Sequence, residues 1–400
     1  MNRRQLLTTA AAAGLAVSPL PAVAQSRARR MTAPKPPVAP VRPKRIEQLG
    51  RVRVDDYAWM KDEQWQKVMR DPKVLQPDIR KHLEAENAYT AAMLKSTEPL
   101  QKTLFEEMKA RIKEDDASVP APDGPYEYYT RFERGAQHPV YARRRLAGDT
   151  AEQVLLDADA AAKGHAYYDV GAAGHAPDQT LWAWAEDDQG SEYYTIKIKD
   201  LATGQVLANP VDTSTGDFAF SPDSRQLFWT LRDENGRPTK IFRRPVRGGK
   251  ADDVLVYEEK DPGMFIGVSR TADDRFMVIG IGDQETSETR YLPASDITGQ
   301  FRVLEPRRKG VKYDADRWSN HWVIRTNADG AVDFKLVFAD DADPSRRTWQ
   351  DWIQHRPGTF LVGFQPYAHH LVRLERVNAN TRLVVTSRET MQDHEVTFPE

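Results

Sequence analysis

The chain has 400 residues, more than one hydrophobic core usually organises, so its length predicts either two domains or a repeat architecture. With 40% hydrophobic and 29% charged residues the composition excludes an intrinsically disordered chain, and 57 basic residues against 59 acidic ones give no sign of a nucleic-acid partner. The absence of cysteine excludes disulfides, thiolate nucleophiles, cysteine-ligated zinc and a lipoprotein anchor.

Residues 1–24 have the pattern of a twin-arginine signal peptide. Arg3-Arg4 precedes a mildly apolar run over 6–17, and Ala22-Val23-Ala24 offers small residues to signal peptidase. A chance Arg-Arg pair is the alternative, but charge, apolar run and cleavage site stand in the right order. The run is too short to span a bilayer, and no later stretch reaches roughly 20 apolar residues. We therefore expect export to the periplasm or beyond, with no membrane anchor after signal cleavage.

The next segments are a linker and a helical region. Residues 25–45 are basic and rich in proline without helical or strand periodicity, which predicts a linker. Within 46–120, the patterns over 78–94 and 97–112 predict two amphipathic helices. The second carries apolar residues at four-residue steps, an arrangement that usually packs into a core; these are Leu100, Leu104, Met108 and Ile112.

After Pro120 the sequence consists of short β-rich runs that recur at a regular spacing. Successive apolar inner-strand runs are separated by 46, 49, 46 and 49 residues; they begin at Leu181, Leu227, Phe276, Trp322 and Leu371. Three of them follow similar turns in which an Asp can accept hydrogen bonds from its own backbone. These turns are Pro177-Asp178, Pro222-Asp223 and Ala272-Asp273. Hairpin signals such as Asn235-Gly236 follow most of the runs.

A period between 45 and 50 residues, with strand and turn alternating, is typical of β-propeller blades. An irregular β-sandwich with accidental spacing is the alternative. The segments 126–132 and 140–145 resemble an additional, earlier blade half. The expectation is an all-β fold, a propeller over 121–400 with about six blades, the last incomplete and a further blade missing, preceded by the helical segment.

Several motifs resemble the N-terminal region of the prolyl oligopeptidase family of serine peptidases. The first three lie in 56–62, 83–89 and 107–120, and the likeness extends from about residue 35 to 400. Within that family the chain is most similar to oligopeptidase B. The segments that carry this closer likeness are Tyr126–Tyr129, Val154–Asp157, Val256–Asp261 and Pro306–Lys309.

The resemblance implies a seven-bladed propeller that caps an α/β-hydrolase domain, with the N-terminal helices wrapping that domain. It implies hydrolysis after Lys or Arg, with the propeller as a gate that admits only short or unstructured peptides. The partners it implies are peptide substrates with basic residues and the chain's own C-terminal hydrolase domain. No cofactor is implied.

The residues for acyl transfer are not recognisable in this sequence. The family uses a Ser on a strand-to-helix turn, usually G-x-S-x-G, followed by Asp and His. The nearest segment, Gly267 to Thr271 around Ser269, lacks the second Gly and reads as a blade connection. We therefore assign no catalytic residue within the chain and expect the triad beyond Glu400.

Other candidate sites have plainer interpretations. His369 and His370 are adjacent, so on a strand they point to opposite faces and do not chelate a metal. The acidic run Glu114-Asp115-Asp116 suggests a solvated helix end or an interdomain contact rather than a substrate site. Gly280 and Gly282 suggest close blade packing. No metal or cofactor site is assigned.

Two functions fit these observations. The first is the gating propeller of an exported oligopeptidase-B-like endopeptidase, inactive as residues 1–400 alone. The second is a propeller without enzymatic activity that serves as a peptide-binding or scaffold module. The helical segment favours the first, because it makes best sense with a hydrolase domain to wrap.

Overall fold

The structure, a computed structural model, describes residues 34–398. The predicted signal peptide and the first part of the predicted linker therefore lie outside the described residues. The chain divides into two compact units, one with the residues up to Lys61 and Gln76–Phe105, the other with Asp62–Leu75 and the chain from Glu106 onward. None of the helices in 34–398 is long and apolar enough to cross a membrane.

The first unit contains both predicted helices, here α2 (Pro77–Leu94) and most of α3 (Glu98–Lys109), joined by the short η3 (Lys95–Thr97). It also contains a hairpin of β1 (Lys44–Gln48) and β2 (Arg51–Asp55), followed by η1 (Ala58–Met60). This hairpin was not predicted from the sequence. Its two-residue turn, Leu49-Gly50, has both residues in the left-handed region, as a tight hairpin of this kind requires.

The second unit begins with α1 (Trp65–Arg70) and η2 (Pro72–Val74), and after α3 it is almost entirely β-structure. Its strands and short helices are β3 (Ala121–Asp123), β4 (Tyr126–Arg131), β5 (Val140–Arg145), β6 (Gln153–Asp157), α4 (Ala158–Ala161), β7 (Asp169–His175), β8 (Leu181–Asp187), β9 (Tyr194–Asp200), β10 (Val211–Phe220), β11 (Gln226–Arg232), β12 (Pro238–Pro245), η4 (Lys250–Asp252), β13 (Val254–Glu258), β14 (Phe265–Arg270), β15 (Phe276–Gly282), β16 (Ser287–Pro293), η5 (Ala294–Asp296), β17 (Arg302–Glu305), β18 (Tyr313–Trp318), β19 (His321–Thr326), η6 (Ala328–Gly330), β20 (Lys335–Ala339), η7 (Arg346–Thr348), β21 (Gln350–Ile353), β22 (Thr359–Pro366), β23 (His370–Val377), β24 (Asn380–Ser387) and β25 (Asp393–Glu395).

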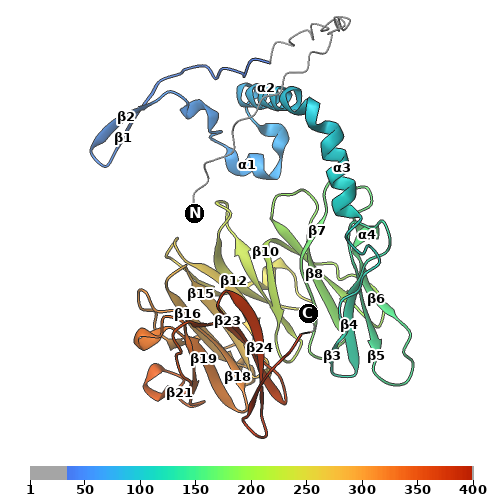
Figure 1. The fold of residues 1–400 in the computed structure, drawn as a ribbon, viewed down its shortest axis with the longest axis vertical. Helices are drawn as coiled ribbons and strands as arrows, with labels where there is room; N and C mark the ends of the chain where they lie inside the picture. The colour runs from blue at the N-terminus through green and yellow to red at the C-terminus, as the bar shows by residue number, and fades with distance from the viewer. Residues whose placement is uncertain (1–33, 399–400) are drawn as a thin grey trace, which may run out of the picture. The chain divides into compact units, whose positions relative to one another are not determined.

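These strands form antiparallel sheets in chain order, from β3–β6 in green to β22–β25 in red (Figure 1). Four sheets have four strands each: β3–β6, β14–β17, β18–β21 and β22–β25. We call each four-stranded unit of the series a module. Each predicted recurring run forms the second strand of a module, at β8, β11, β15, β19 and β23. The expected early blade half is in fact a complete four-stranded sheet, and the last sheet also has four strands. Both expectations of incompleteness were wrong.

The remaining sheet has seven strands, β7 to β13. It comprises two four-stranded modules, β7–β10 and β10–β13, that share the strand β10. β10 pairs with β9 at Val211 and Ser214, and with β11 at Ser214 and again from Phe218 onward. The register shifts once in each pairing; Thr213 and Gly216, which have positive φ values, lie within these two shifts. One long, kinked strand thus closes one four-stranded module and opens the next.

The hydrophobic core lies between neighbouring sheets. Along β8, Leu181, Ala183 and Ala185 pack into the cluster shared with β10 and β11, whereas Trp182 and Trp184 pack into the cluster with β6. A strand alternates its side chains between two faces, and here both faces are covered by a neighbouring sheet. This is why the strand sequence is apolar almost throughout.

The three predicted Asp turns form as expected. Asp178, Asp223 and Asp273 each accept a hydrogen bond through Oδ1 from the backbone N–H two residues later, at 3.0–3.1 Å. The residue after each Asp has a positive φ between 56° and 64°. The side-chain hydrogen bond holds a backbone shape that is otherwise costly for residues other than glycine.

Candidate functional site

Ser269, the nearest sequence candidate for a nucleophile, lies within β14 and pairs with Val278 of β15. The predicted connection between blades at this position was wrong. A serine within a paired strand is not on the strand-to-helix turn that exposes a hydrolase nucleophile. No hydrogen bond joins its hydroxyl to a histidine among the residues that the structure describes. The geometry gives Ser269 no activating base.

The adjacent histidines do not form a metal site. His370 begins β23 opposite Ser387, and His369 lies in the preceding turn, where its carbonyl accepts from Arg388 N–H at 2.8 Å. Within 34–398, no group of three or more His, Cys, Asp or Glu side chains is placed to hold a metal ion.

Two of the three carboxylates in the acidic run after α3, those of Glu114 and Asp116, have cationic partners within the same segment. Lys109 Nζ lies 3.3 Å from Glu114 Oε1, and Lys113 Nζ lies 3.1 Å from Asp116 Oδ1. The hydrogen bond from Lys113 lowers the pKa of the Asp116 carboxyl. These carboxylates therefore already have cationic partners, which agrees with a solvated chain segment better than with a site for a basic substrate.

Two of the oligopeptidase-B-like motifs meet in space. Arg307 Nη2 donates to Glu259 Oε2 at 2.6 Å and Arg307 Nε donates to Glu288 Oε2 at 3.3 Å, and both carboxylate side chains are 6% exposed. Burial opposes the charge of Glu259 and is the largest single effect, but the hydrogen bonds from Arg307, the Asp261 backbone N–H and Tyr257 together outweigh it and bring the pKa to about 2. Tyr257 also donates to Glu259, at 2.7 Å. This network ties the end of β13 to β16 and β17, so these motifs are structural.

The stripe on α3 is exposed, contrary to the expectation that it packs into a core. Leu100, Leu104, Met108 and Ile112 are 45–68% exposed, and Phe105 beside them is 58% exposed. Exposing a run of apolar side chains along one helix face to water is unfavourable in free energy, and burying it would be favourable. The described residues thus leave an apolar helix face without a partner.

Each pair of consecutive modules is joined by hydrogen bonds across the seam between them. One contact per seam is Lys199 Nζ to Leu155 O, Asp178 N to Ser224 Oγ, Val268 N to Asp217 Oδ2, Arg317 Nε to Asp273 Oδ2 and Arg325 Nε to Leu361 O, all at 2.8–3.0 Å. Between the first sheet, β3–β6, and the last, β22–β25, the described chain has no hydrogen bond or ion pair. The succession of sheets is therefore not closed by such contacts.

The last sheet has one covered face and one that is only partly covered. Leu371 packs with β18–β20 on the covered face. On the other face Val372 lies opposite Val385 and Leu374 lies opposite Leu383, and all four side chains are partly exposed. None of these four belongs to a core cluster of the described residues. This is an apolar sheet face without a neighbour.

The first sheet differs on its corresponding face. Tyr128 packs toward β7 and β8, so Tyr129 and Arg131 face the other way, where Arg131 and the Tyr129 hydroxyl both donate to Glu152. These side chains are partly exposed. The free face of the first sheet is thus polar and charged, whereas that of the last sheet is apolar.

Comparison with known proteins gives the family. Residues 36–399 match the family described as prolyl oligopeptidase, N-terminal beta-propeller domain. Dipeptidyl aminopeptidase BI from Pseudoxanthomonas mexicana is 39% identical over 361 residues, which are 86% of this chain and 48% of that protein. Protease 2 from Moraxella lacunata is 28% identical over 365 residues, covering 90% of this chain and 51% of that protein.

The fold agrees with a solved structure of the same kind. Oligopeptidase B from Leishmania major superimposes with a TM-score of 0.82 at 29% sequence identity, over 92% of this chain and 54% of that one. The chain thus spans about half the length of the relatives it matches. With its open succession of four-stranded modules and its N-terminal helices, the chain belongs to the prolyl oligopeptidase family and carries that family's N-terminal β-propeller domain.

Proposed function

We propose that these residues are the N-terminal portion of an exported serine peptidase, in which the propeller admits short or unstructured peptides to a separate α/β-hydrolase domain. The observation that carries the proposal is the family match over 36–399, in relatives of about twice the matched length. In this arrangement the propeller selects by size, and the hydrolase domain supplies the Ser, Asp and His for acyl transfer.

The exposed face of α3 supports a hydrolase domain as its partner. Burying leucine, methionine and phenylalanine side chains is worth about 1.5–3 kcal/mol each. Leu104, Phe105 and Met108 would contribute on this scale if a second domain covered them. We assign this face to the hydrolase domain.

We place a seventh blade between the first and last sheets, which no described hydrogen bond or ion pair joins. Such a blade would cover the apolar face around Val372 and Leu374 and meet the charged face around Arg131. Six modules are described, counting β10 twice, and the complete ring in this proposal has seven.

Two cleavage modes compete. Likeness to oligopeptidase B favours internal cleavage after Lys or Arg. The relative with 39% identity is named a dipeptidyl aminopeptidase, which favours release of dipeptides from a free N-terminus. The two modes differ in what they require of the substrate's amino group, because only the second needs it free.

The test uses one pair of fluorogenic substrates, Arg-Arg-aminomethylcoumarin with a free amino group and the same compound with a benzyloxycarbonyl cap. If the complete protein hydrolyses the capped compound, it is an endopeptidase. If it hydrolyses only the compound with the free amino group, it is a dipeptidyl aminopeptidase. Substrates ending in Ala-Ala serve as the control for basic specificity. Complete protein that hydrolyses none of these peptides would refute the proposed peptidase function and favour the scaffold alternative.

Export rests on the sequence of residues 1–24 alone. Replacing Arg3 and Arg4 together by Lys keeps the charge but removes the arginine pair, and we expect the protein to remain in the cytoplasm. Cell fractionation followed by immunoblotting measures this. Unchanged export of the double variant would rule out the twin-arginine route.

A further inference from the structure

A cavity of about 640 Å³ opens where the sheet β18–β21 meets the last sheet. Its walls come from the β18–β19 turn, the end of β20, the start of β21 and the β24–β25 turn. The residues that line it are Trp318, Ser319, Asn320, His321, Phe338, Ala339, Asp340, Asp341, Thr348, Gln350 and Met391. The volume is ample for one long side chain together with part of a peptide backbone.

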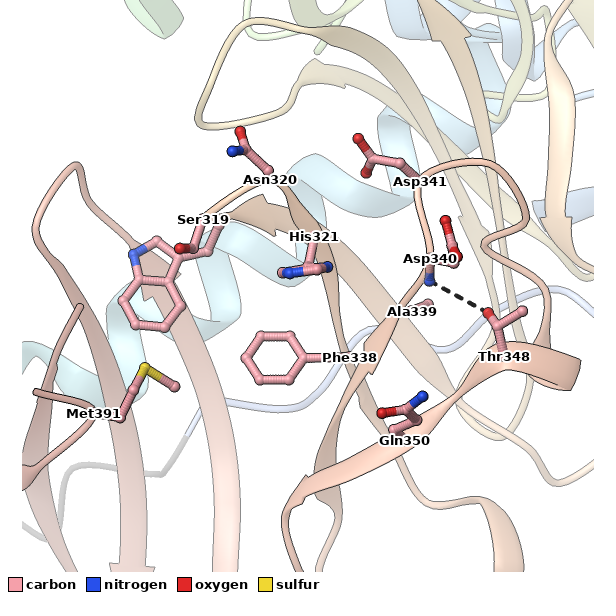
Figure 2. A pocket seen from close by; sticks show the side chains of 11 residues that line it. Ser319, Asn320, His321, Phe338, Ala339, Asp340, Asp341, Thr348, Gln350 and Met391 are labelled. Carbon is pink, nitrogen blue, oxygen red and sulfur yellow. Dashed lines mark hydrogen bonds between the residues drawn. The ribbon is translucent and has the colours of Figure 1, made fainter. Parts of the chain in front are cut away.

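One wall is aromatic and rigid. Phe338 stacks on Trp352 with ring centroids 4.5 Å apart, and Trp318 stacks on the same indole at 5.4 Å. His321 lies against Phe338 at 5.6 Å. In Figure 2 Phe338 and His321 occupy the middle of the view, with Met391 on one side and the two aspartates on the other. The rings are held by one another, so the wall exists before any ligand arrives.

The opposite side carries one carboxylate with a cationic partner and one without. Asp341 pairs with the buried guanidinium of Arg317, whose Nη2 lies 2.9 Å from Oδ2, and also with Arg275. Asp340 is exposed and accepts only a backbone hydrogen bond, from Ala342 N at 2.9 Å. No ion pair to Asp340 occurs in the described part of the chain.

The lining contains no Lys or Arg. Arg388 lines a neighbouring cavity, and its guanidinium is engaged by Ser319 Oγ and Ala368 O. The charge that the cavity presents to a ligand is therefore that of Asp340.

We propose that this cavity binds the guanidinium side chain of an arginine in an extended peptide. A guanidinium is flat and positively charged, so it stacks on an aromatic face and donates parallel hydrogen bonds to a carboxylate. Phe338 and His321 supply the face, and Asp340 supplies the carboxylate. Met391 and the aromatic wall cover the aliphatic stem. The site lies on the propeller itself and holds peptide without any hydrolytic chemistry.

The experiment titrates residues 1–400 with N-acetyl-arginine methylamide and follows saturation-transfer NMR signals of the ligand. We expect saturable binding with a dissociation constant of about 1 mM. N-acetyl-citrulline methylamide, which has the same shape without the charge, should bind at least about fivefold more weakly. Absence of saturation by about 10 mM arginine probe, or equal affinity for the citrulline probe, would overturn the proposal.

Asp340→Asn should weaken arginine binding about fivefold, because it removes the charge and keeps the turn. Asp149→Asn is the matched control, since Asp149 is exposed and accepts the same kind of hydrogen bond, from Ala151 N at 3.0 Å, but lines no part of the cavity. Met391→Lys places a cation at the rim and should abolish arginine binding, whereas Met391→Leu should leave it unchanged. Unchanged affinity in Asp340→Asn and Met391→Lys would contradict the assignment. The readout is binding, so its failure leaves the proposed peptidase function untouched.

Discussion

Glu259 and Arg307 show how a pair of residues far apart in sequence stabilises a seam. The pKa of Glu259, about 2 against an ordinary value of 4.5, means that the folded chain favours the ionised carboxylate. A folded-state pKa below the unfolded value stabilises the fold above about pH 4.5, and this contribution is lost as pH falls toward 2. We expect the unfolding free energy to decline across that window.

Glu259→Gln should lower the unfolding free energy at pH 7 by about 2 kcal/mol and flatten the decline between pH 4.5 and 2, since the ion pair to Arg307 is lost. Urea unfolding at a series of pH values measures both effects. Glu234→Gln, at an exposed turn position, is the control and should change neither. A variant with the wild-type pH profile would show that Glu259 does not provide this stability.

Two glycines test how closely individual residues are packed. A Cβ on Gly171 would lie 2.6 Å from the ring of Tyr194, and that ring is fixed by its hydrogen bond to Asp169 and by Gly216 on its other side. Gly171→Ala should therefore cost about 2 kcal/mol. A Cβ on Gly280 would meet no heavy atom within 4 Å, so Gly280→Ala should be neutral or slightly stabilising. Thermal unfolding distinguishes them, and equal effects would contradict the packing described.

At the scale of elements, the sequence predicted what local chemistry determines. The Asp turns and the apolar second strands follow from hydrogen bonding and from burial on both faces, and both were predicted correctly. The close packing predicted at Gly280 was wrong, whereas Gly282, whose added Cβ would lie 3.1 Å from Thr286 O, is tightly packed. Whether a glycine in a strand is crowded depends on which atoms of the folded chain lie next to it. The spacing of the repeats in the sequence does not reveal those neighbours.

The α3 stripe was misjudged for a related reason. Its spacing correctly predicted a helix with one apolar face, but periodicity does not say which part of a protein covers that face. The ion pair between Glu259 and Arg307 also could not be predicted from the sequence, because it depends on how two sheets pack against each other. The cavity beside Phe338 had no signal in the sequence at all, since its walls come from turns of two different modules.

Leu104→Gln tests the role of this helix face. In residues 1–400 the side chain is already 45% exposed, so the unfolding free energy should change by less than about 0.5 kcal/mol. In the complete protein the same change should cost about 1 kcal/mol or more if the hydrolase domain buries it. Lys102→Gln, on another side of α3, is the control for both proteins. Equal small effects of Leu104→Gln in the two proteins would show that no domain covers the face.

At the scale of the whole molecule, hydrogen bonds join each module to the next, whereas within residues 34–398 no hydrogen bond or ion pair joins the first module to the last. In a repeat protein, each interface between neighbouring modules contributes to the stability of the fold. A module whose face has no neighbour lacks that contribution. The free apolar face of the last sheet, the charged face of the first and the exposed stripe of α3 all agree with a propeller that belongs to a larger protein. Ser269, the nearest sequence candidate for a nucleophile, lies in a paired strand and not on a turn that exposes it for hydrolysis.

The central claim is that this portion admits peptides and that hydrolysis resides in another domain of the same protein. Labelling with a fluorescent serine-directed phosphonate tests it most directly, applied in parallel to residues 1–400 and to the complete protein. We expect one labelled serine in the complete protein, lost when the protein is denatured first, and no labelling of residues 1–400. Stoichiometric labelling of a serine within residues 1–400 would contradict it.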